Sequence, residues 1–502
     1  MLSTIDTQIK YLRKACGSFG KRSLKDRLTE SENMLADIKS KKKKGSPDLL
    51  RLLEPFFHAV EIDENKYYMT AISCYTAIFK SKPEKGYIDI PVLDAILKSL
   101  FIIDKFPIEE NRIKAANCII ACISSISAKM FIHGSVLLFM FEYLLNLYNT
   151  ATLPESRDSV GKVINQLVEY YLGNYGKPPV IPHFETIEAM TSTVSDIICN
   201  NSLIISKYCP KNPECTINDI DIIMIIRAFC AKIGKGSSAT SLLCTKVIQQ
   251  ILSLQTPFVT APFFIGELRT TIHVALLSLC LDSNEALAKP TAEMILTIWR
   301  RFPQFYNEGL NEVLDQGLAT ALVSPSPKMM IRSFRLYSYL VMNPQFMVDS
   351  FVNYDCDDGG IFHNIFENTV NIIVKRSYPE QATDQIQKEA LTTLLIILKN
   401  LWKYYTELST SNQSETTETV AESVMSQKKA KNQIERAQEI FKKSPNKALK
   451  YFSTHNMCKD TPQSYADFLF NTGWLDPTGV GEIIGGSKPL NLEILPLFVN
   501  HF

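Results

Sequence analysis

Apolar residues recur at helical spacing along almost the whole chain. In residues 91–104, the apolar positions Val92, Ile96, Leu100 and Ile103 fall on one face of a helix with 3.6 residues per turn. The same spacing returns in six further segments, namely 111–127, 134–149, 219–233, 265–281, 292–302 and 329–342. Runs that alternate polar and apolar residues between hairpin turns are few. The pattern therefore predicts an all-α protein.

The length and number of these helices favour a particular architecture. Helices of about 12–18 residues follow one another for about 400 residues, with short polar turns between them. An apolar stripe on each of many short helices can be buried only by stacking on neighbouring helices. We therefore predict a HEAT- or armadillo-like helical solenoid, although the sequence shows no strict repeat consensus. A tether and an incomplete small helical domain are predicted to follow it.

Three segments interrupt the helical pattern. Residues 39–48 form a basic loop, read as a solvated connector or as a weak contact with anionic lipid. Residues 173–182 are rich in Gly and Pro and suggest a linker between two helical blocks. Residues 407–431 are rich in Ser, Thr and Glu, which predicts a disordered tether.

Helix signals return after the tether. Thr461-Pro462 and Asp476-Pro477 each combine a capping side chain with a proline at the first helical position. Ser444-Pro445 separates two helices, and Gly485-Gly486 marks a helix end.

The charge balance narrows the function classes. The chain has 53 Lys and Arg against 52 Asp and Glu, a net charge of +1, which argues against sequence-independent binding of nucleic acid. Twelve scattered cysteines are expected to be reduced core residues. The sequence shows neither a signal peptide nor an apolar run of bilayer length. We therefore expect a cytoplasmic protein, associated with membranes only at their periphery.

Familiar catalytic and cofactor motifs are missing. The seven histidines lie far apart, and no HExxH, Walker A, GxGxxG or GxSxG pattern occurs. The cysteines lack the spacing of a zinc site. The sequence therefore predicts no catalytic residue, no metal and no cofactor.

One polar cluster remains, in the stretch FVNYDCDDGGIFHNIFE at residues 351–367. It can be read as a metal site, a catalytic acid pair or a capped turn. A calcium loop that starts at Asn353 places Asp358 where glycine is required and Asn364 where a bidentate glutamate is required. A loop that starts at Asp355 places Phe366 at that last position.

A capped turn fits the stretch better. A metal–nucleotide site at Asp355 and Asp357 would need a neighbouring sheet, and a catalytic acid pair would need a cleft. Asp357 or Asp358 can cap the helix that follows, with the two glycines making the turn. We expect Asn353, Asp355 and Asp357 to bond loop backbone, and Tyr354 and Cys356 to pack inward.

Several strings also resemble one known family. FVNYDCD (351–357) with NIFE (364–367) resembles the signature box upstream of the Sec7 domain in large Golgi-type, brefeldin-inhibited Arf guanine-nucleotide exchange factors. YLRKAC (11–16) and SVGKVINQLVEYYLGN (159–174) are similar to the start and end of that family's N-terminal dimerisation and cyclophilin-binding region. ADFLFNTGWLDPTGVGEIIGG and LNLEILPLFVNHF, near the C-terminus, are similar to the first helices of the Sec7 domain.

The resemblance implies a division of the chain. It gives a dimerisation and cyclophilin-binding-like region at 1–180 and an upstream-homology region at 190–405. A tether follows at 407–431, and the N-terminal part of a Sec7 domain at 432–502. It also implies that the interaction box consists of five residues: Asn353, Tyr354, Asp355, Cys356 and Asp357.

The function follows from the same resemblance. It implies the regulatory part of an exchange factor for an Arf-family GTPase in vesicular transport, forming a homodimer through its N-terminal region at Golgi or trans-Golgi membranes. The family's catalytic glutamate loop would follow Phe502, and Glu482 and Glu493 match earlier helices. We therefore expect the chain not to be an enzyme by itself. The alternatives are a HEAT-type transport adaptor unrelated to exchange and a metal-dependent enzyme.

Overall fold

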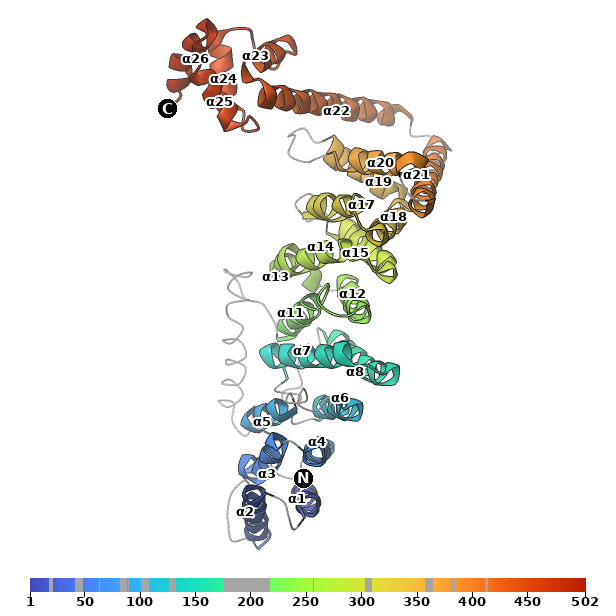
Figure 1. Ribbon diagram of the computed structural model, residues 1–502, viewed down its shortest axis with the longest axis vertical. Coiled ribbons are helices and arrows are strands. Elements are labelled where there is room, and N and C mark those ends of the chain that lie inside the picture. The colour runs from blue at the N-terminus through green and yellow to red at the C-terminus, as the bar shows by residue number, and fades with distance from the viewer. Residues whose placement is uncertain are drawn as a thin grey trace. The chain divides into compact units, whose positions relative to one another are not determined.

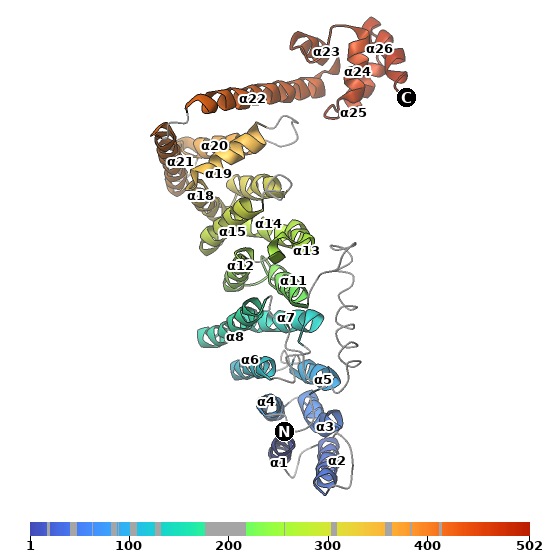
Figure 2. The same ribbon diagram turned by 180° about the vertical axis from the view of Figure 1, so that it is seen from behind.

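Helices account for all the regular structure that is described. The computed structural model describes residues 1–17, 21–40, 48–62, 64–81, 88, 90–100, 108–125, 132–175, 217–255, 257–302, 309–356, 364–381, 384–410 and 414–502. Within these ranges every regular element is a helix, which confirms the predicted all-α class. The chain forms two compact units, Met1–Asp282 and Ser283–Phe502. Their ribbons are drawn in Figures 1 and 2.

The first unit is a succession of short helices. Their bounds are α1 (Leu2–Cys16), α2 (Arg22–Lys39), α3 (Leu49–Glu61), α4 (Asn65–Lys80), α5 (Ile90–Leu100), α6 (Glu109–Ser124), α7 (Gly134–Thr150), α8 (Pro154–Gly173), α11 (Ile217–Cys230), α12 (Ser238–Leu252), α13 (Pro262–Glu267) and α14 (His273–Cys280), with a π-helical turn, η4 (Leu268–Ile272), before α14.

These helices stack in two rows. In one row α1 contacts α4, α4 contacts α6, and α6 contacts α8. In the other row α3 packs between α2 and α5, and farther along the unit α7 packs against α11. Figures 1 and 2 show the same arrangement from opposite sides. This stacking is solenoid-like, as predicted.

Apolar periodicity explains why these segments are helical. In α1 the buried residues are Ile5, Ile9, Leu12 and Cys16, whose separations of four, three and four residues place them on one face. In α3 the start is fixed by Asp48, whose carboxylate accepts a hydrogen bond of 3.1 Å from the amide of Arg51. Each helix is therefore set by a buried stripe, and α3 also by a capped end.

The second unit contains longer helices and further π-helical turns. Its elements are α15 (Ala288–Arg301), η7 (Val313–Ala319), α17 (Thr320–Leu322), α18 (Pro327–Val341), α19 (Pro344–Ser350), η8 (Phe351–Asp355), α20 (Ile365–Arg376), α21 (Asp384–Thr410), α22 (Ser414–Lys443), α23 (Pro445–Thr454), α24 (Pro462–Asn471), α25 (Pro477–Ile484) and α26 (Pro489–Val499). Within it, α15 packs on α18, α18 on α21, and α21 on α20.

The segment predicted to be a disordered tether is largely helical. Helix α21 continues to Thr410, and α22 begins at Ser414 and runs to Lys443. The prediction was wrong about secondary structure because it rested on the scarcity of large apolar residues. Residues 414–443 are rich in Glu, Lys, Gln and Ala, which favour helices. Buried polar contacts replace large apolar side chains in the part of α22 that was predicted to be disordered. The family-based domain boundaries stay a prediction.

The predicted boundaries of the C-terminal helices are confirmed. Helix α22 ends at Lys443, and α23 begins at Pro445. The Thr461 hydroxyl accepts a hydrogen bond of 3.3 Å from the amide of Ser464 at the start of α24. At the start of α25, Asp476 accepts one of 3.3 Å from the amide of Thr478.

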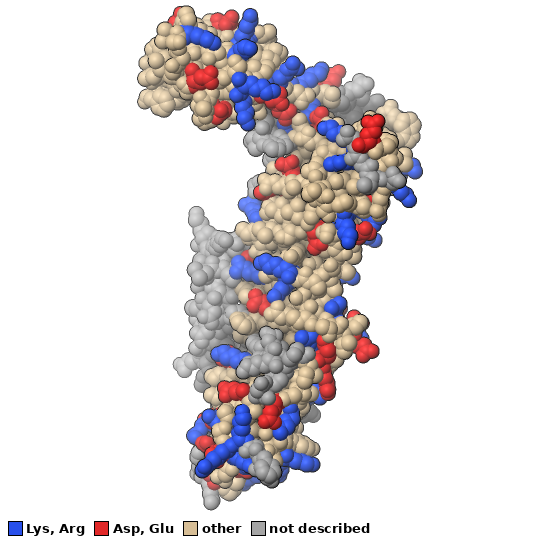
Figure 3. Space-filling model, viewed as in Figure 1, with Lys and Arg blue, Asp and Glu red and all other residues tan. Residues whose placement is uncertain are grey.

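Charge and sulfur are distributed as the composition suggests. On the face drawn in Figure 3, basic and acidic side chains are interspersed, with broad uncharged areas between them. The described cysteines are free thiols, and all but Cys458 are buried. Among the described helices, none is both long enough and apolar enough to cross a membrane. The basic loop at 41–47 and the linker from 176 lie outside the described residues.

Candidate functional site

The interaction box begins with a π-helical turn. Here η8 continues α19, and the amide of Cys356 donates a hydrogen bond of 3.0 Å to the carbonyl of Phe351, five residues earlier. Such turns within helices are frequent at functional sites. This one directs Tyr354, Asp355 and Cys356 inward, where their exposed fractions are 0%, 0% and 2%.

Asp355 caps the helix that follows the box. One carboxylate oxygen accepts a hydrogen bond of 3.1 Å from the amide of Phe366, and the other accepts one of 2.8 Å from the amide of Glu367. Both donors belong to the first turn of α20, where amides lack partners within the helix. Burial raises the pKa of Asp355 above its ordinary value, although the two amide donors oppose that shift.

The capping residue differs from the two that the sequence suggested. Asp357 and Asp358 lie outside the described residues, and Asp355 supplies the described cap. Asn353 also differs from expectation, since its side-chain amide donates 2.8 Å to the carbonyl of Asp349, within the preceding helix rather than to the loop. The box is therefore tied to a helix on each side.

Helix α22 lies against the box through buried polar contacts. The ammonium group of Lys431, which has 0% exposure, donates to the backbone carbonyl of Tyr354. Lys428 lies 2.8 Å from the side-chain oxygen of Asn364 and 2.9 Å from the carboxylate of Glu367. A separation of three residues places both lysines on one face of α22.

A further polar contact extends this interface along α22. The side-chain amide of Asn364 donates a hydrogen bond of 3.0 Å to the carboxylate of Glu435. Glu435 lies one turn beyond Lys431, on the same face of the helix. Asn364 therefore contacts α22 with both ends of its amide group, because its oxygen accepts from Lys428.

The energetics of the contact depend on pairing. Burying an ammonium group costs several kcal/mol unless its donors are bonded, so Lys428 and Lys431 stabilise α22 only in the register that the box accepts. The sequence interpretation missed these two lysines. The sequence signal for this contact was weak, because it consists of two lysines three residues apart in a segment whose composition suggested disorder.

The arrangement of the described box residues suits a structural role, the positioning of helices, better than a catalytic one. Among the described residues, no three His, Cys, Asp or Glu side chains lie together in a group that could hold a metal ion. Burial raises the pKa of the Cys356 thiol, which disfavours the nucleophilic thiolate. The described box residues therefore fix the relative positions of η8, α20 and α22.

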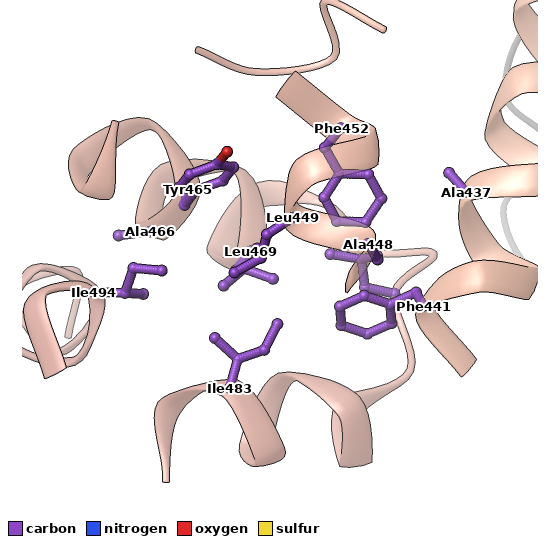
Figure 4. Close-up of a cluster of buried hydrophobic side chains, with 11 residues drawn as sticks. Ala437, Phe441, Ala448, Leu449, Phe452, Tyr465, Ala466, Leu469, Ile483 and Ile494 are labelled. Atoms are coloured by element: carbon purple, nitrogen blue, oxygen red, sulfur yellow. The ribbon is translucent and has the colours of Figure 1, made fainter. Parts of the chain in front are cut away.

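The C-terminal end of α22 contributes to a buried apolar cluster that is separate from the box. Ala437 and Phe441 belong to a buried apolar cluster with side chains from α23, α24, α25 and α26 (Figure 4). Ile483 and Ile494 are fully buried in it. The segment 432–502 therefore folds around a core of its own, and apolar residues such as Leu469 find partners there.

One helix thus joins the box to this C-terminal core. Lys431 and Phe441 are ten residues apart, or about 15 Å along a helix. Lys431 contacts the box, and Phe441 packs within the cluster. A continuous helix is rigid over that length, so the box contacts restrict where the cluster begins.

Comparison with known families assigns the C-terminal segment. Residues 430–502 match the family model of the Sec7 domain. That range contains the last half of α22 and all of α23–α26. The cluster in Figure 4 is therefore the core of a Sec7-domain segment.

Curated relatives extend the match upstream. The chain is 24% identical over 321 residues to brefeldin A-inhibited guanine nucleotide-exchange protein 1 of Homo sapiens, covering 52% of this chain and 17% of the relative. It is 25% identical over 190 residues to ARF guanine-nucleotide exchange factor GNL2 of Arabidopsis thaliana, covering 32% of this chain and 14% of that relative. The chain is 34% identical over 83 residues to cytohesin-4 of Mus musculus, covering 16% of this chain and 21% of that relative.

These matches overturn one expectation and confirm another. The prediction that the chain is not an enzyme is wrong, because a Sec7-domain segment and relatives named as exchange proteins indicate a family of exchange catalysts. The resemblance read from the box and the C-terminal strings is confirmed. Residues 430–502 match the Sec7 domain, and the chain is similar to large, brefeldin-inhibited Arf guanine-nucleotide exchange factors.

Proposed function

We propose that this chain is the N-terminal regulatory portion of an Arf exchange factor and that its Sec7 segment acts on an Arf-family GTPase in vesicular transport. The observation that carries the proposal is the Sec7 match at residues 430–502, a segment with its own buried core. The chain spans about a sixth of the length of the brefeldin-inhibited relatives that it matches. Their printed names supply the reaction, nucleotide exchange.

The proposed role of the box is to position the Sec7 segment. Lys428 and Lys431 attach α22 to η8 and α20, and the same helix supplies Ala437 and Phe441 to the Sec7 core. A change in the helical region that disturbs the box is therefore transmitted to the start of the Sec7 segment. This gives the interaction box a regulatory consequence without any catalytic residue.

The remaining proposals concern assembly and location. We propose that the chain forms a homodimer through residues 1–180 and works in the cytoplasm at the periphery of Golgi or trans-Golgi membranes. Support comes from the strings at residues 11–16 and 159–174, which resemble the N-terminal dimerisation region of that family. A HEAT-type adaptor unrelated to exchange has less support, since it does not explain the Sec7 match.

Nucleotide release from an Arf tests the exchange proposal. An Arf loaded with fluorescent GDP is mixed with the purified 502-residue chain, and both release and binding are followed. Saturable binding with faster release supports the proposal. Binding without faster release would keep Arf as the partner and refute the catalytic part. Neither binding nor faster release from a folded chain would refute the whole.

A further inference from the structure

Helix α21 carries a long apolar stripe on its outer surface. The stripe consists of Leu391, Leu395, Leu398, Trp402 and Tyr405, with exposed fractions of 45%, 55%, 64%, 69% and 64%. Their separations of four, three, four and three residues keep them on one face of the helix. Scattered exposed apolar residues need no explanation, but a continuous row of five marks an interaction surface.

The opposite face fixes the orientation of the stripe. Ile386, Ala390, Thr393 and Ile397 are at most 5% exposed, and they face the contacts of α21 with α18 and α20. The hydroxyl of Thr393 lies 2.9 Å from that of Ser338. Helix α21 is therefore unable to roll its stripe inward without breaking a packed interface.

An ion pair adds to this fixed orientation. The guanidinium of Arg335, on α18, lies 2.7 Å from the carboxylate of Glu389, on α21. This contact raises the pKa of Arg335, so the cation is held more firmly. The ribbon views place α21 at the edge of the second unit, with α18 and α20 beside it (Figures 1 and 2).

The charges beside the stripe are mainly positive. Lys388, Lys399 and Lys403 are exposed and follow one flank of the stripe, since they lie eleven and four residues apart. Glu407 is the exposed acid among the described side chains of α21, and it lies 3.7 Å from Lys403. The flank therefore offers an excess of ammonium groups to a partner.

This combination fits an anionic bilayer. Leucines beside tryptophan and tyrosine, with lysines on the flank, are the composition of helices that lie in a membrane interface. Trp and Tyr favour the headgroup level because their rings are apolar and their tips are polar. Here Trp402 and Tyr405 lie together, with ring centroids 6.2 Å apart.

A second copy of the chain fits less well. If a two-fold axis perpendicular to α21 paired the stripes of two copies, the helices would be antiparallel and both lysine flanks would lie on the same side of the pair. The ammonium groups of the two flanks would then face one another, and like charges repel. An anionic surface neutralises the lysines instead.

We propose that the outer face of α21 is a membrane-contact surface that docks on anionic lipid. The inference deepens the peripheral association proposed above and rests on it for the kind of partner. The apolar stripe would enter the headgroup region while the lysine flank meets lipid phosphates or carboxylates. The bilayer would then hold the second unit through a helix packed directly against α18 and α20.

Vesicle flotation of the full chain tests the proposal. Phosphatidylcholine vesicles are compared with vesicles that also contain phosphatidylserine. The wild-type chain is expected to float mainly with the anionic vesicles. Each lysine near an anionic surface changes the partition coefficient about fivefold, so the double variant Lys399→Glu/Lys403→Glu should lower it about 25-fold or more. The double variant Leu395→Ser/Trp402→Ser should lower it by at least about tenfold.

Matched controls lie on other helices. Phe139→Ser removes an aromatic side chain with 60% exposure from α7. Lys289→Glu changes a lysine that pairs with a glutamate four residues later, as Lys403 pairs with Glu407. The two pairs have similar separations, 3.8 Å for Lys289–Glu293 and 3.7 Å for Lys403–Glu407. Both controls should float like the wild type. Flotation that falls equally in controls and stripe variants would overturn the assignment to α21.

Two further readouts separate the outcomes. Emission from Trp402, obtained as the difference between wild type and Trp402→Phe, should shift to shorter wavelength when anionic vesicles are added. Sedimentation without lipid should give one mass for wild type and the Leu395→Ser/Trp402→Ser variant. A mass that falls in the variant would instead assign the stripe to a second copy and overturn the proposal.

The result is independent of the exchange proposal. Arf binding and nucleotide release are measured in solution without vesicles, where the stripe variants should match the wild type. If the wild type does not float with anionic vesicles, the membrane surface is refuted, and the Arf assay still decides the exchange function. If it floats without dependence on the stripe, peripheral association stands and the α21 surface is refuted.

Discussion

Lys431 of α22 donates a hydrogen bond to the backbone carbonyl of Tyr354, and neither residue has exposed surface. The two residues are 77 positions apart in the sequence. Their contact joins the interaction box to a helix whose other end lies in the Sec7 core. The buried charge selects one register of α22 against the box, because other registers would leave the Lys431 ammonium group or the Tyr354 carbonyl without this partner.

Replacing this lysine should release α22 from the box. In Lys431→Met the carbonyl of Tyr354 loses a buried donor, which costs about 1–3 kcal/mol. We expect faster amide hydrogen exchange in residues 422–443 and a lower unfolding temperature. Lys429→Met is the control, since Lys429 is an exposed lysine two residues earlier on the same helix. Equal exchange in the two variants would contradict the proposed attachment.

The cap supplied by Asp355 should be measurable separately. Asp355→Ala leaves the amides of Phe366 and Glu367 without their acceptor, so α20 should lose about 1–2 kcal/mol. Asp355→Asn keeps one acceptor oxygen and should lose less. In urea unfolding of the full chain, we expect the wild type to be the most stable, Asp355→Asn to be intermediate and Asp355→Ala to be the least stable. An alanine variant as stable as the wild type would show that the cap contributes nothing.

The same substitution carries the prediction made from the resemblance. The resemblance to the exchange-factor family also implies that the box contacts the N-terminal region. We therefore expect Asp355→Ala to loosen the association between residues 1–180 and 190–410. Binding of the two purified pieces measures this directly. Asp158→Ala, which removes an exposed carboxylate from α8, is the control. Equal affinity with and without the Asp355 change would refute the expectation.

The sequence could predict the helices but not the contact that unites them. Periodic apolar residues such as Ile5, Ile9 and Leu12 identify a buried face from neighbouring positions alone. The pairing of Lys431 with Tyr354 depends on where two distant helices meet, which no local pattern contains. Composition was misleading as well, because polar residues that suggested disorder provide the buried donors of α22.

A glycine in α25 tests the packing of the Sec7 segment. A Cβ atom at Gly479 would lie 2.6 Å from a ring carbon of Phe441, so Gly479→Ala should overpack the core by about 1–3 kcal/mol. Gly481→Ala is a control in the same helix, since a Cβ there meets nothing within 4 Å. Alanine favours helix over glycine, so this control should be slightly stabilising. Thermal unfolding measures both, and destabilisation by Gly481→Ala alone would contradict the packing described.

The last prediction concerns a second buried carboxylate. Asp221 of α11 lies 2.7 Å from Nδ1 of His133 and accepts a hydrogen bond of 2.8 Å from the amide of Gly134, at the start of α7. Burial raises the pKa of Asp221 above its ordinary value of 3.8, although His133 and the amide oppose the shift. The folded chain therefore binds this proton more tightly than the unfolded chain does.

The sign of the pH dependence follows from that raised pKa. The contribution of Asp221 to the free energy of unfolding is fully present below about pH 3.8 and is lost as the pH rises through the folded pKa. Asparagine does not titrate, so the stability of the wild type minus that of Asp221→Asn should fall over this range and then level off. Urea unfolding at a series of pH values measures the difference, with Asp158→Asn on the exposed surface of α8 as the control. A difference that grows as the pH rises would mean that His133 and Gly134 outweigh burial, because ionised Asp221 would then be the stabilised form.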